Sequence, residues 1–319
     1  MKKRLLTGLF IILALAATLF LRTVSPFIAD AVIVGISTIA CLEVSKALIK
    51  GQRPCNKLLT AIYPILIYLG FFIGIMNQVV FYYYIIYYLV VALVCLLFNF
   101  LMPFFFRKET EEEIKNSSNP KTSVKHYAWD KTINSMIVFA YPAILSVPYL
   151  IINHLPEFTE LTTKYVDMLN VTNFAWFLIA CIFVVSMLTD TGAYLVGSAL
   201  KGPKLCPAIS PKKTISGAIG GLLFGIFGAF AVAFAFFTWV DGFELFLHSL
   251  GGTVWTVLLI GLIGSILTQL GDILASLLKR KCGIKDYGNI LPGHGGIMDR
   301  IDGQIFNTAF LFIIGIILL

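Results

Sequence analysis

Charged residues that could do chemistry are concentrated in one short stretch, residues 276–302, which reads SLLKRKCGIKDYGNILPGHGGIMDRID. This stretch holds three aspartates, five basic residues and a histidine within a Gly-rich turn. Carboxylate oxygens are the ligands that Mg²⁺ prefers, whereas basic side chains and the backbone N–H groups of such a turn bind anions. Carboxylates and basic groups together predict metal-assisted handling of phosphates.

Asp272 lies four residues before this stretch and belongs to the same predicted site. In TQLGDILASLLKR, Asp272, Ser276, Lys279 and Arg280 are spaced i, i+4, i+7 and i+8, which places them on one stripe of a helix. Asp272 is about two turns inside the end of an apolar run, where a carboxylate costs several kcal/mol unless it is paired or hydrated. We therefore predict a metal or cation ligand, with a salt bridge to Lys279 or Arg280 as the alternative.

Two further polar clusters lie upstream and are predicted to join this site. In SMLTDTGAYLVGS (186–198), Asp190 and Tyr194 are four residues apart and share a helical face. In KGPKLCPAISPKKTISG (201–217), a proline precedes Lys212, Lys213 and Thr214, and Ser216 is a candidate first residue of the next helix.

The elements that must position these residues are apolar helices. The chain has 319 residues, of which 58% are hydrophobic and 13% charged, and its mean hydropathy is +0.89, so we predict an all-α polytopic membrane protein. A spanning helix needs roughly 20 mainly apolar residues. Nine runs qualify, near 5–21, 27–45, 58–76, 79–106, 132–153, 173–200, 215–240, 252–278 and 303–319.

The basic residues predict the orientation of these nine spans. With the N-terminus in the cytoplasm, all of the 24 Lys and Arg residues except Arg22 and Lys164 fall on the cytoplasmic side, as the positive-inside rule requires. The C-terminus is then outside. The net charge of +7 thus reflects membrane orientation, and we expect no nucleic-acid partner. A cleaved signal peptide at the N-terminus is the alternative for the first span.

The chain divides by its polar content into two predicted regions. Residues 1–131 comprise four spans and a charged stretch, 107–131, that we expect to be a solvated linker. Residues 132–319 comprise the other five spans and carry the site at the cytoplasmic side. Within the run 215–240, Gly217, Gly221 and Gly225 lie on one face and predict close helix packing.

The stretch 276–302 resembles the signature of the phosphatidate cytidylyltransferase (CDP-diacylglycerol synthase) family. Its fixed positions are filled here by Ser276, Lys279, Arg280, Lys285, Asp286, Gly288, Pro292, His294, Gly295, Gly296, Asp299, Arg300 and Asp302. The segments DTGAYLVG and SPKKT also resemble the family, so that the resemblance covers roughly 186–305. One position departs from the pattern, because Ser216 stands where an acidic or amide residue is expected.

The resemblance implies transfer of the cytidylyl group of CTP to phosphatidate, which gives CDP-diacylglycerol and pyrophosphate. It implies Mg²⁺ held by Asp272 and Asp299, with Asp302 as a further metal or nucleotide contact. Asp190 is expected to bind substrate by reading the nucleotide, or to hold a second cation such as K⁺. The residues expected to clamp phosphates or bind substrate are Lys212, Lys213, Thr214, Ser276, Lys279, Arg280, Lys285, Gly295, Gly296 and Arg300. His294 is expected to contact the triphosphate or to protonate the leaving group.

Partners and alternatives follow from the same resemblance. We expect CTP, phosphatidate and the lipid bilayer as partners, and the sequence leaves open whether the protein forms a homodimer. We expect a plasma or inner membrane location, with the site facing the cytoplasm. A related enzyme with another acceptor, such as an isoprenoid ether lipid, is the first alternative. A cation-coupled transporter is the second, although charges gathered at one face, and not at the bilayer midplane, count against it.

Overall fold

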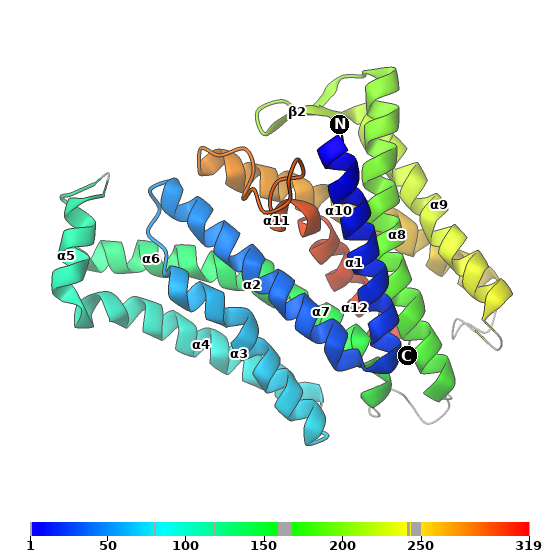
Figure 1. Ribbon diagram of the computed structural model, residues 1–319, viewed down its shortest axis with the longest axis horizontal. Helices are drawn as coiled ribbons and strands as arrows, with labels where there is room; N and C mark the ends of the chain where they lie inside the picture. The colour runs from blue at the N-terminus through cyan, green and yellow to red at the C-terminus, as the bar shows by residue number, and fades with distance from the viewer. Residues whose placement is uncertain are drawn as a thin grey trace. The chain divides into compact units, whose positions relative to one another are not determined.

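The computed structural model describes residues 2–79, 81–117, 119–158, 168–240, 243 and 250–318, and these residues are predominantly helical (Figure 1). The predicted all-α class is therefore confirmed. Lys164 lies outside the described residues, as do the side chains of Lys2, Lys3 and Arg4.

The described residues include eight helices that are long and apolar enough to cross a membrane, so the chain is a polytopic integral membrane protein. These segments are Leu6–Val24, Pro26–Lys50, Lys57–Met76, Tyr83–Phe105, Val124–Asn153, Val171–Leu200, Ile215–Trp239 and Gly252–Lys281. The ninth predicted span corresponds to Gln304–Leu318, which at about 1.5 Å per residue is shorter than the hydrocarbon core. The count of nine and the orientation of the termini stay predictions.

The chain forms two compact units, which are described separately. Unit 1 consists of Met1–Ile144 and Leu278–Asp299, and unit 2 consists of Leu145–Leu277 and Arg300–Leu319. The regions predicted from the sequence, 1–131 and 132–319, follow membrane topology and stay predictions.

Unit 1 is built from the first six helices and the short segment 278–299. The helices are α1 (Lys2–Val24), α2 (Pro26–Lys50), α3 (Lys57–Met76), α4 (Phe81–Phe105), α5 (Arg107–Lys115) and α6 (Val124–Val138). Its core is aromatic: the buried rings of Tyr63 and Phe139 meet edge to face at 5.1 Å, and Phe71 packs against Tyr84. Asn99 donates a hydrogen bond to the Tyr63 hydroxyl at 2.9 Å, so the polar atoms of this core are partly satisfied within it.

The predicted helix 132–153 is interrupted. α6 passes into a π-helical turn, Phe139–Ala143, then a 3₁₀ turn, Ile144–Ser146, before α7 (Val147–Asn153) begins. Pro142 explains the break, because proline lacks the N–H that an α-helix needs and π-turns absorb such interruptions. The Ser37 hydroxyl donates to the Pro142 carbonyl at 3.0 Å, which ties α2 to the break.

The prediction of a solvated linker over 107–131 was wrong. Residues 107–115 form α5, since this segment consists mainly of strong helix formers and Arg107 pairs with Glu111 one turn on. Glu113 then accepts hydrogen bonds from the Tyr127 hydroxyl and the Lys131 ammonium, each at 2.8 Å, and so joins α5 to α6. Burial alone would raise the pKa of Glu113, but these two hydrogen bonds hold it below its ordinary value.

Unit 2 carries the longest helices and a small hairpin. Its elements are α7, a 3₁₀ turn (Leu155–Glu157), α8 (Met168–Leu200), β1 (Lys204–Cys206), β2 (Ser210–Thr214), α9 (Ile215–Trp239), most of α10 (Leu250–Lys281) and α12 (Gln304–Leu318). Figure 1 shows α8 and α9 side by side. The predicted glycine packing is confirmed and is made within the chain: a Cβ on Gly217 would meet the Ala193 carbonyl at 2.8 Å, and one on Gly225 would overlap the Ser265 hydroxyl.

Buried hydroxyl and amide groups join three helices of unit 2. Asn307 of α12 donates to the Ser186 hydroxyl of α8 at 3.0 Å, which lies 3.2 Å from the Thr268 hydroxyl of α10. Thr189 donates to Ser265 at 2.9 Å. These contacts are typical of polar groups between membrane helices. They join α8 to α10 at residues that lie only a few positions before Asp190 and Asp272 in the sequence.

Candidate active site

The hairpin that precedes α9 presents the lysines of the PKKT segment. β1 and β2 pair antiparallel, with Lys204 opposite Thr214. Thr214 caps α9, because its hydroxyl accepts the Gly217 N–H at 3.1 Å. Ser216 accepts the Gly202 N–H at 3.2 Å and donates to Thr214. The residue that departs from the family pattern thus holds the hairpin to the helix, and the helix begins one residue earlier than Ser216.

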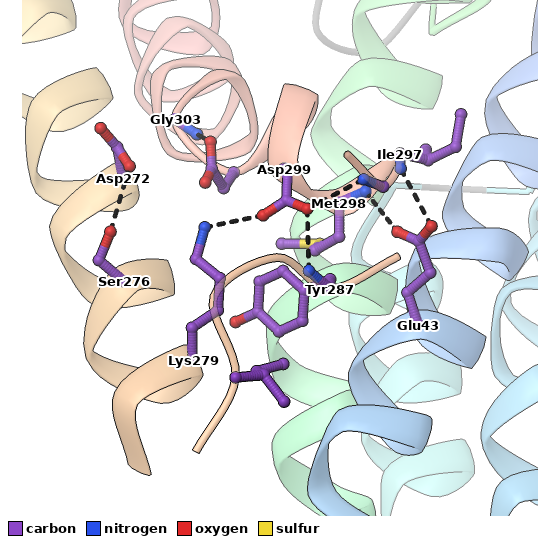
Figure 2. A network of polar contacts seen from close by, with 12 residues as sticks. Glu43, Asp272, Ser276, Lys279, Tyr287, Ile297, Met298, Asp299 and Gly303 are labelled. Atoms are coloured by element: carbon purple, nitrogen blue, oxygen red, sulfur yellow. Dashed lines mark hydrogen bonds and ion pairs between the residues drawn. The ribbon is translucent and has the colours of Figure 1, made fainter. Parts of the chain in front are cut away.

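Unit 2 gathers Asp272, Lys213 and Ser276 in direct contact. The Lys213 ammonium lies 2.7 Å from Asp272 Oδ2 and 3.5 Å from the Gln269 carbonyl. The Ser276 hydroxyl contacts Asp272 Oδ1 at 3.5 Å (Figure 2). The helical spacing therefore brings Asp272 and Ser276 together, and the ion-pair partner of Asp272 is Lys213 of the hairpin, not the predicted alternatives Lys279 or Arg280.

Asp190 belongs to the same cluster of charges. The groups that interact electrostatically with it are the Asp272 carboxylate, the Lys213 ammonium and the Arg300 guanidinium. Two carboxylates near two basic groups form a site of mixed charge, which can take a cation and the phosphate oxygens that accompany it.

Several predicted phosphate-binding residues lie at the protein surface. Lys212, Arg280, Lys285 and Arg300 are all exposed. Arg280 also donates to the Ile284 carbonyl at 3.2 Å, which turns its side chain toward the segment that follows α10.

Unit 1 holds a second, buried cluster around Asp299. Its Oδ1 pairs with the Lys279 ammonium at 2.7 Å, and its Oδ2 accepts the N–H groups of Tyr287 and Gly296 at 2.9 and 3.0 Å (Figure 2). The side chains of Lys279 and Asp299 are 10% and 5% exposed. Lys279 also lies 5.2 Å from the centroid of the Tyr287 ring. Both oxygens of Asp299 therefore have fixed partners.

The Gly-rich segment forms a tight turn. The His294 N–H donates to the Leu291 carbonyl at 2.9 Å, with proline at the second position and Gly293 at φ 78° in the third, as a type II turn requires. The N–H groups of Gly295 and Gly296 donate to Leu291 and Asp299. His294 Nδ1 is buried and finds no hydrogen-bond partner within the described residues.

Asp302 occupies a turn. Asp299 belongs to α11 (Met298–Ile301), and Asp302 follows before α12 begins. Asp302 is 8% exposed, and its Oδ1 accepts the Gly303 N–H at 2.9 Å.

Comparison with known proteins shows the family of the chain. Residues 2–318 match the model of the cytidylyltransferase family. The chain belongs to this family. It is 42% identical over 144 residues to a phosphatidate cytidylyltransferase of Brucella suis biovar 1, which covers 45% of this chain and 48% of the relative. It is 46% identical over 132 residues to the protein of the same name from Staphylococcus haemolyticus, which covers 41% and 46%. The chain thus spans about half the length of the curated relatives it matches.

The match confirms the family that the sequence resembled, and raises the question of the metal that the family implies. Within the described residues, no three His, Cys, Asp or Glu side chains form a group that could hold a metal ion by themselves. Mg²⁺ is usually held by one or two carboxylates together with waters and substrate phosphates. Asp272 fits this role, because its Oδ1 has only the 3.5 Å contact with Ser276 among described residues and its side chain is 37% exposed. Asp299 fits less readily, since Lys279 and two N–H groups occupy its oxygens.

Glu43 of α2 contacts the signature segment, and the sequence did not predict this contact. Its side chain is buried, at 2% exposed. Its two carboxylate oxygens accept the N–H groups of Ile297 and Met298 at 3.1 and 2.8 Å. Glu43 lies about two turns before the end of α2 at Lys50, so the signal was a carboxylate inside an apolar helix, as for Asp272.

Proposed function

We propose that the chain transfers the cytidylyl group of CTP to phosphatidate, with CDP-diacylglycerol and pyrophosphate as products. The family match over residues 2–318 carries this proposal. Relatives named phosphatidate cytidylyltransferase support the choice of substrates. The ion pairs of Lys213 and Lys279 with aspartates add the mixture of charges that the reaction needs.

The chemistry is a displacement at the α-phosphorus of CTP. A phosphate oxygen of phosphatidate forms the new P–O bond, the bond from the α-phosphorus to the bridging oxygen breaks, and pyrophosphate leaves with that electron pair. The phosphatidate phosphate is already ionised at neutral pH, so no residue has to act as a general base. The main obstacle is repulsion between two anions, which positive groups at fixed positions reduce.

The basic residues supply this positive charge. We assign Lys213 and Lys279 to phosphate oxygens as compact charges, with Lys212 and Lys285 at the surface. Arg280 and Arg300 offer planar forks for bidentate contact with phosphate. His294 is assigned to the triphosphate or to protonation of the leaving group, because its Nδ1 has no hydrogen-bond partner within the described residues. Thr214, Ser276, Gly295 and Gly296 are assigned to shaping the substrate site.

We assign Mg²⁺ to Asp272, with Asp299 and Asp302 as further ligands and Asp190 beside a second cation such as K⁺. When bound, Mg²⁺ would supply positive charge that neutralises the phosphates. Asp272 and Asp299 would hold it as carboxylates that are also paired with Lys213 and Lys279. We also propose that the site faces the cytoplasm in the plasma or inner membrane, as the positive-inside rule requires.

The proposal is tested by turnover. Purified protein in lipid nanodiscs receives CTP labelled at the α-phosphorus, phosphatidate and Mg²⁺, and the lipid fraction is analysed. We expect label in CDP-diacylglycerol, none when ATP replaces CTP, and none with Asp272→Asn. Faster labelling of an isoprenoid ether lipid phosphate would instead assign that acceptor. Absence of labelled lipid with every acceptor would refute the proposed activity.

A further inference from the structure

The feature that carries a further inference is the contact between Glu43 and the segment 296–299 of the family signature. Glu43 comes from α2, more than 250 residues earlier in the chain, and both partners belong to unit 1. Each of its oxygens accepts one backbone N–H, from Ile297 at 3.1 Å and from Met298 at 2.8 Å (Figure 2). A carboxylate that accepts two N–H groups in a buried place forms strong, directional hydrogen bonds.

These bonds continue directly into those of Asp299. The N–H groups of three consecutive residues, 296 to 298, all donate to carboxylates, the first to Asp299 and the next two to Glu43. The backbone that precedes Asp299 is thereby held on both sides. Because a side chain takes its direction from its backbone, the position of the Asp299 carboxylate depends on Glu43.

The signature loop packs closely against the Glu43 carboxylate. A Cβ on Gly288 would overlap the Glu43 carboxylate, and so would a Cβ on Gly296. Two glycines of the signature therefore allow the loop to close on this one carboxylate. A second close approach lies at the end of α2, where a Cβ on Gly51 would meet the Cys282 backbone at 2.8 Å. α2 thus supports the signature segment at two points.

We propose that Glu43 is a positioning residue for the transferase reaction, which orients Asp299 through the 296–298 backbone and makes no contact with substrate. This inference rests on the proposed function. It assigns a role to the N-terminal helices, which the resemblance to the family did not reach. Partners that hold a functional carboxylate in place typically change activity by about 10–100-fold when they are replaced.

The test compares Glu43→Gln with a matched control, Glu113→Gln. Glutamine keeps the shape of the side chain but offers one acceptor oxygen, so its NH₂ group must face one of the two N–H donors. Glu113 also accepts two hydrogen bonds, from Tyr127 and Lys131, in the same unit but away from the signature. We expect Glu43→Gln to lower kcat roughly 10–100-fold with little change in KM for CTP, and Glu113→Gln to leave both unchanged.

Two measurements separate positioning from a merely structural role. Amide hydrogen exchange should accelerate at Ile297 and Met298 in Glu43→Gln and not in Glu113→Gln, and this readout needs no turnover. In an Asp299→Asn background, Glu43→Gln should have little further effect on kcat, because both substitutions act through the same carboxylate. Additive losses, unchanged exchange or wild-type kcat would each overturn the proposal.

A second variant covers the case in which Glu43→Gln does not fold. Gly288→Ala introduces a methyl group against the Glu43 carboxylate from the loop side, and we expect the same loss of kcat and the same faster exchange. Wild-type kcat in Gly288→Ala would overturn the proposal. If the wild-type protein makes no CDP-diacylglycerol, the proposed function fails, whereas the exchange of Ile297 and Met298 still decides whether Glu43 holds this backbone.

Discussion

Replacing Lys279 with methionine tests the buried ion pair with Asp299. Both side chains are almost completely buried, 10% and 5% exposed, and their charged atoms are 2.7 Å apart. Removing one partner of a buried pair costs about 3–5 kcal/mol, because the other charge is left without compensation. Asp299 keeps the N–H groups of Tyr287 and Gly296, so we expect the lower end of this range. Loss of the contact with the Tyr287 ring adds about 0.5–1 kcal/mol. The total is about 3–4 kcal/mol of unfolding free energy.

The assay is equilibrium unfolding in mixed micelles with increasing denaturing detergent, followed by circular dichroism, for four proteins in a double-mutant cycle. Lys279→Met and Asp299→Asn should each lower the unfolding free energy. The loss in the double variant should be about 2–3 kcal/mol smaller than the sum of the two single losses, since no unpaired charge remains buried. Lys285→Met, which removes an exposed lysine of the same segment, should stay within about 0.5 kcal/mol. Additive effects in the cycle would refute the view that this pair is a coupled, buried unit.

Three other predictions concern groups with different surroundings. Asp272→Asn should abolish most activity yet change the unfolding free energy by less than about 1 kcal/mol, because its pair with Lys213 is partly exposed and such pairs contribute little; turnover and detergent unfolding check both halves. His294→Ala should lower kcat without lowering stability, since no hydrogen bond of Nδ1 within the described residues is lost, and a parallel loss of stability would contradict the assigned role. The pKa of Glu113 is below its ordinary value, so its stabilising contribution is present above about pH 4–5 and is lost as the pH falls through the folded pKa. Between pH 6 and 3, the unfolding free energy should therefore fall further in the wild type than in Glu113→Gln, by less than about 1 kcal/mol because the carboxylate is half exposed.

The membrane class and most helices could be predicted because both depend on local composition. Runs of about 20 apolar residues must form helices in lipid whatever their partners are. The stripe of Asp272 and Ser276 was predictable for the same reason, since helical spacing alone brings these two side chains together. Close packing of the Gly217 face followed from residue size, but its partner, α8, did not.

Contacts between distant segments could not be predicted in this way. Hydrophobic periodicity does not reveal that Lys213 pairs with Asp272 and Lys279 with Asp299, because either lysine is chemically suitable for either aspartate. The same limit hid the role of Ser216, whose hydroxyl partners lie in the turn before β1 and at the end of β2. Pro142 could have indicated the break in the helix, but the long apolar run around it favoured one continuous helix.

The relation between α2 and the signature explains why sequence similarity alone undervalues the N-terminal half. Along α2, almost every position needs only to be apolar, and many residue types satisfy that need. One position must also present a carboxylate at the depth of the Ile297 and Met298 N–H groups, and Glu43 does so. A few polar positions in 25 residues leave little trace in composition. Glu43 nevertheless sets the backbone of the segment that carries Asp299, so the signature depends on a helix that lies far from it in sequence.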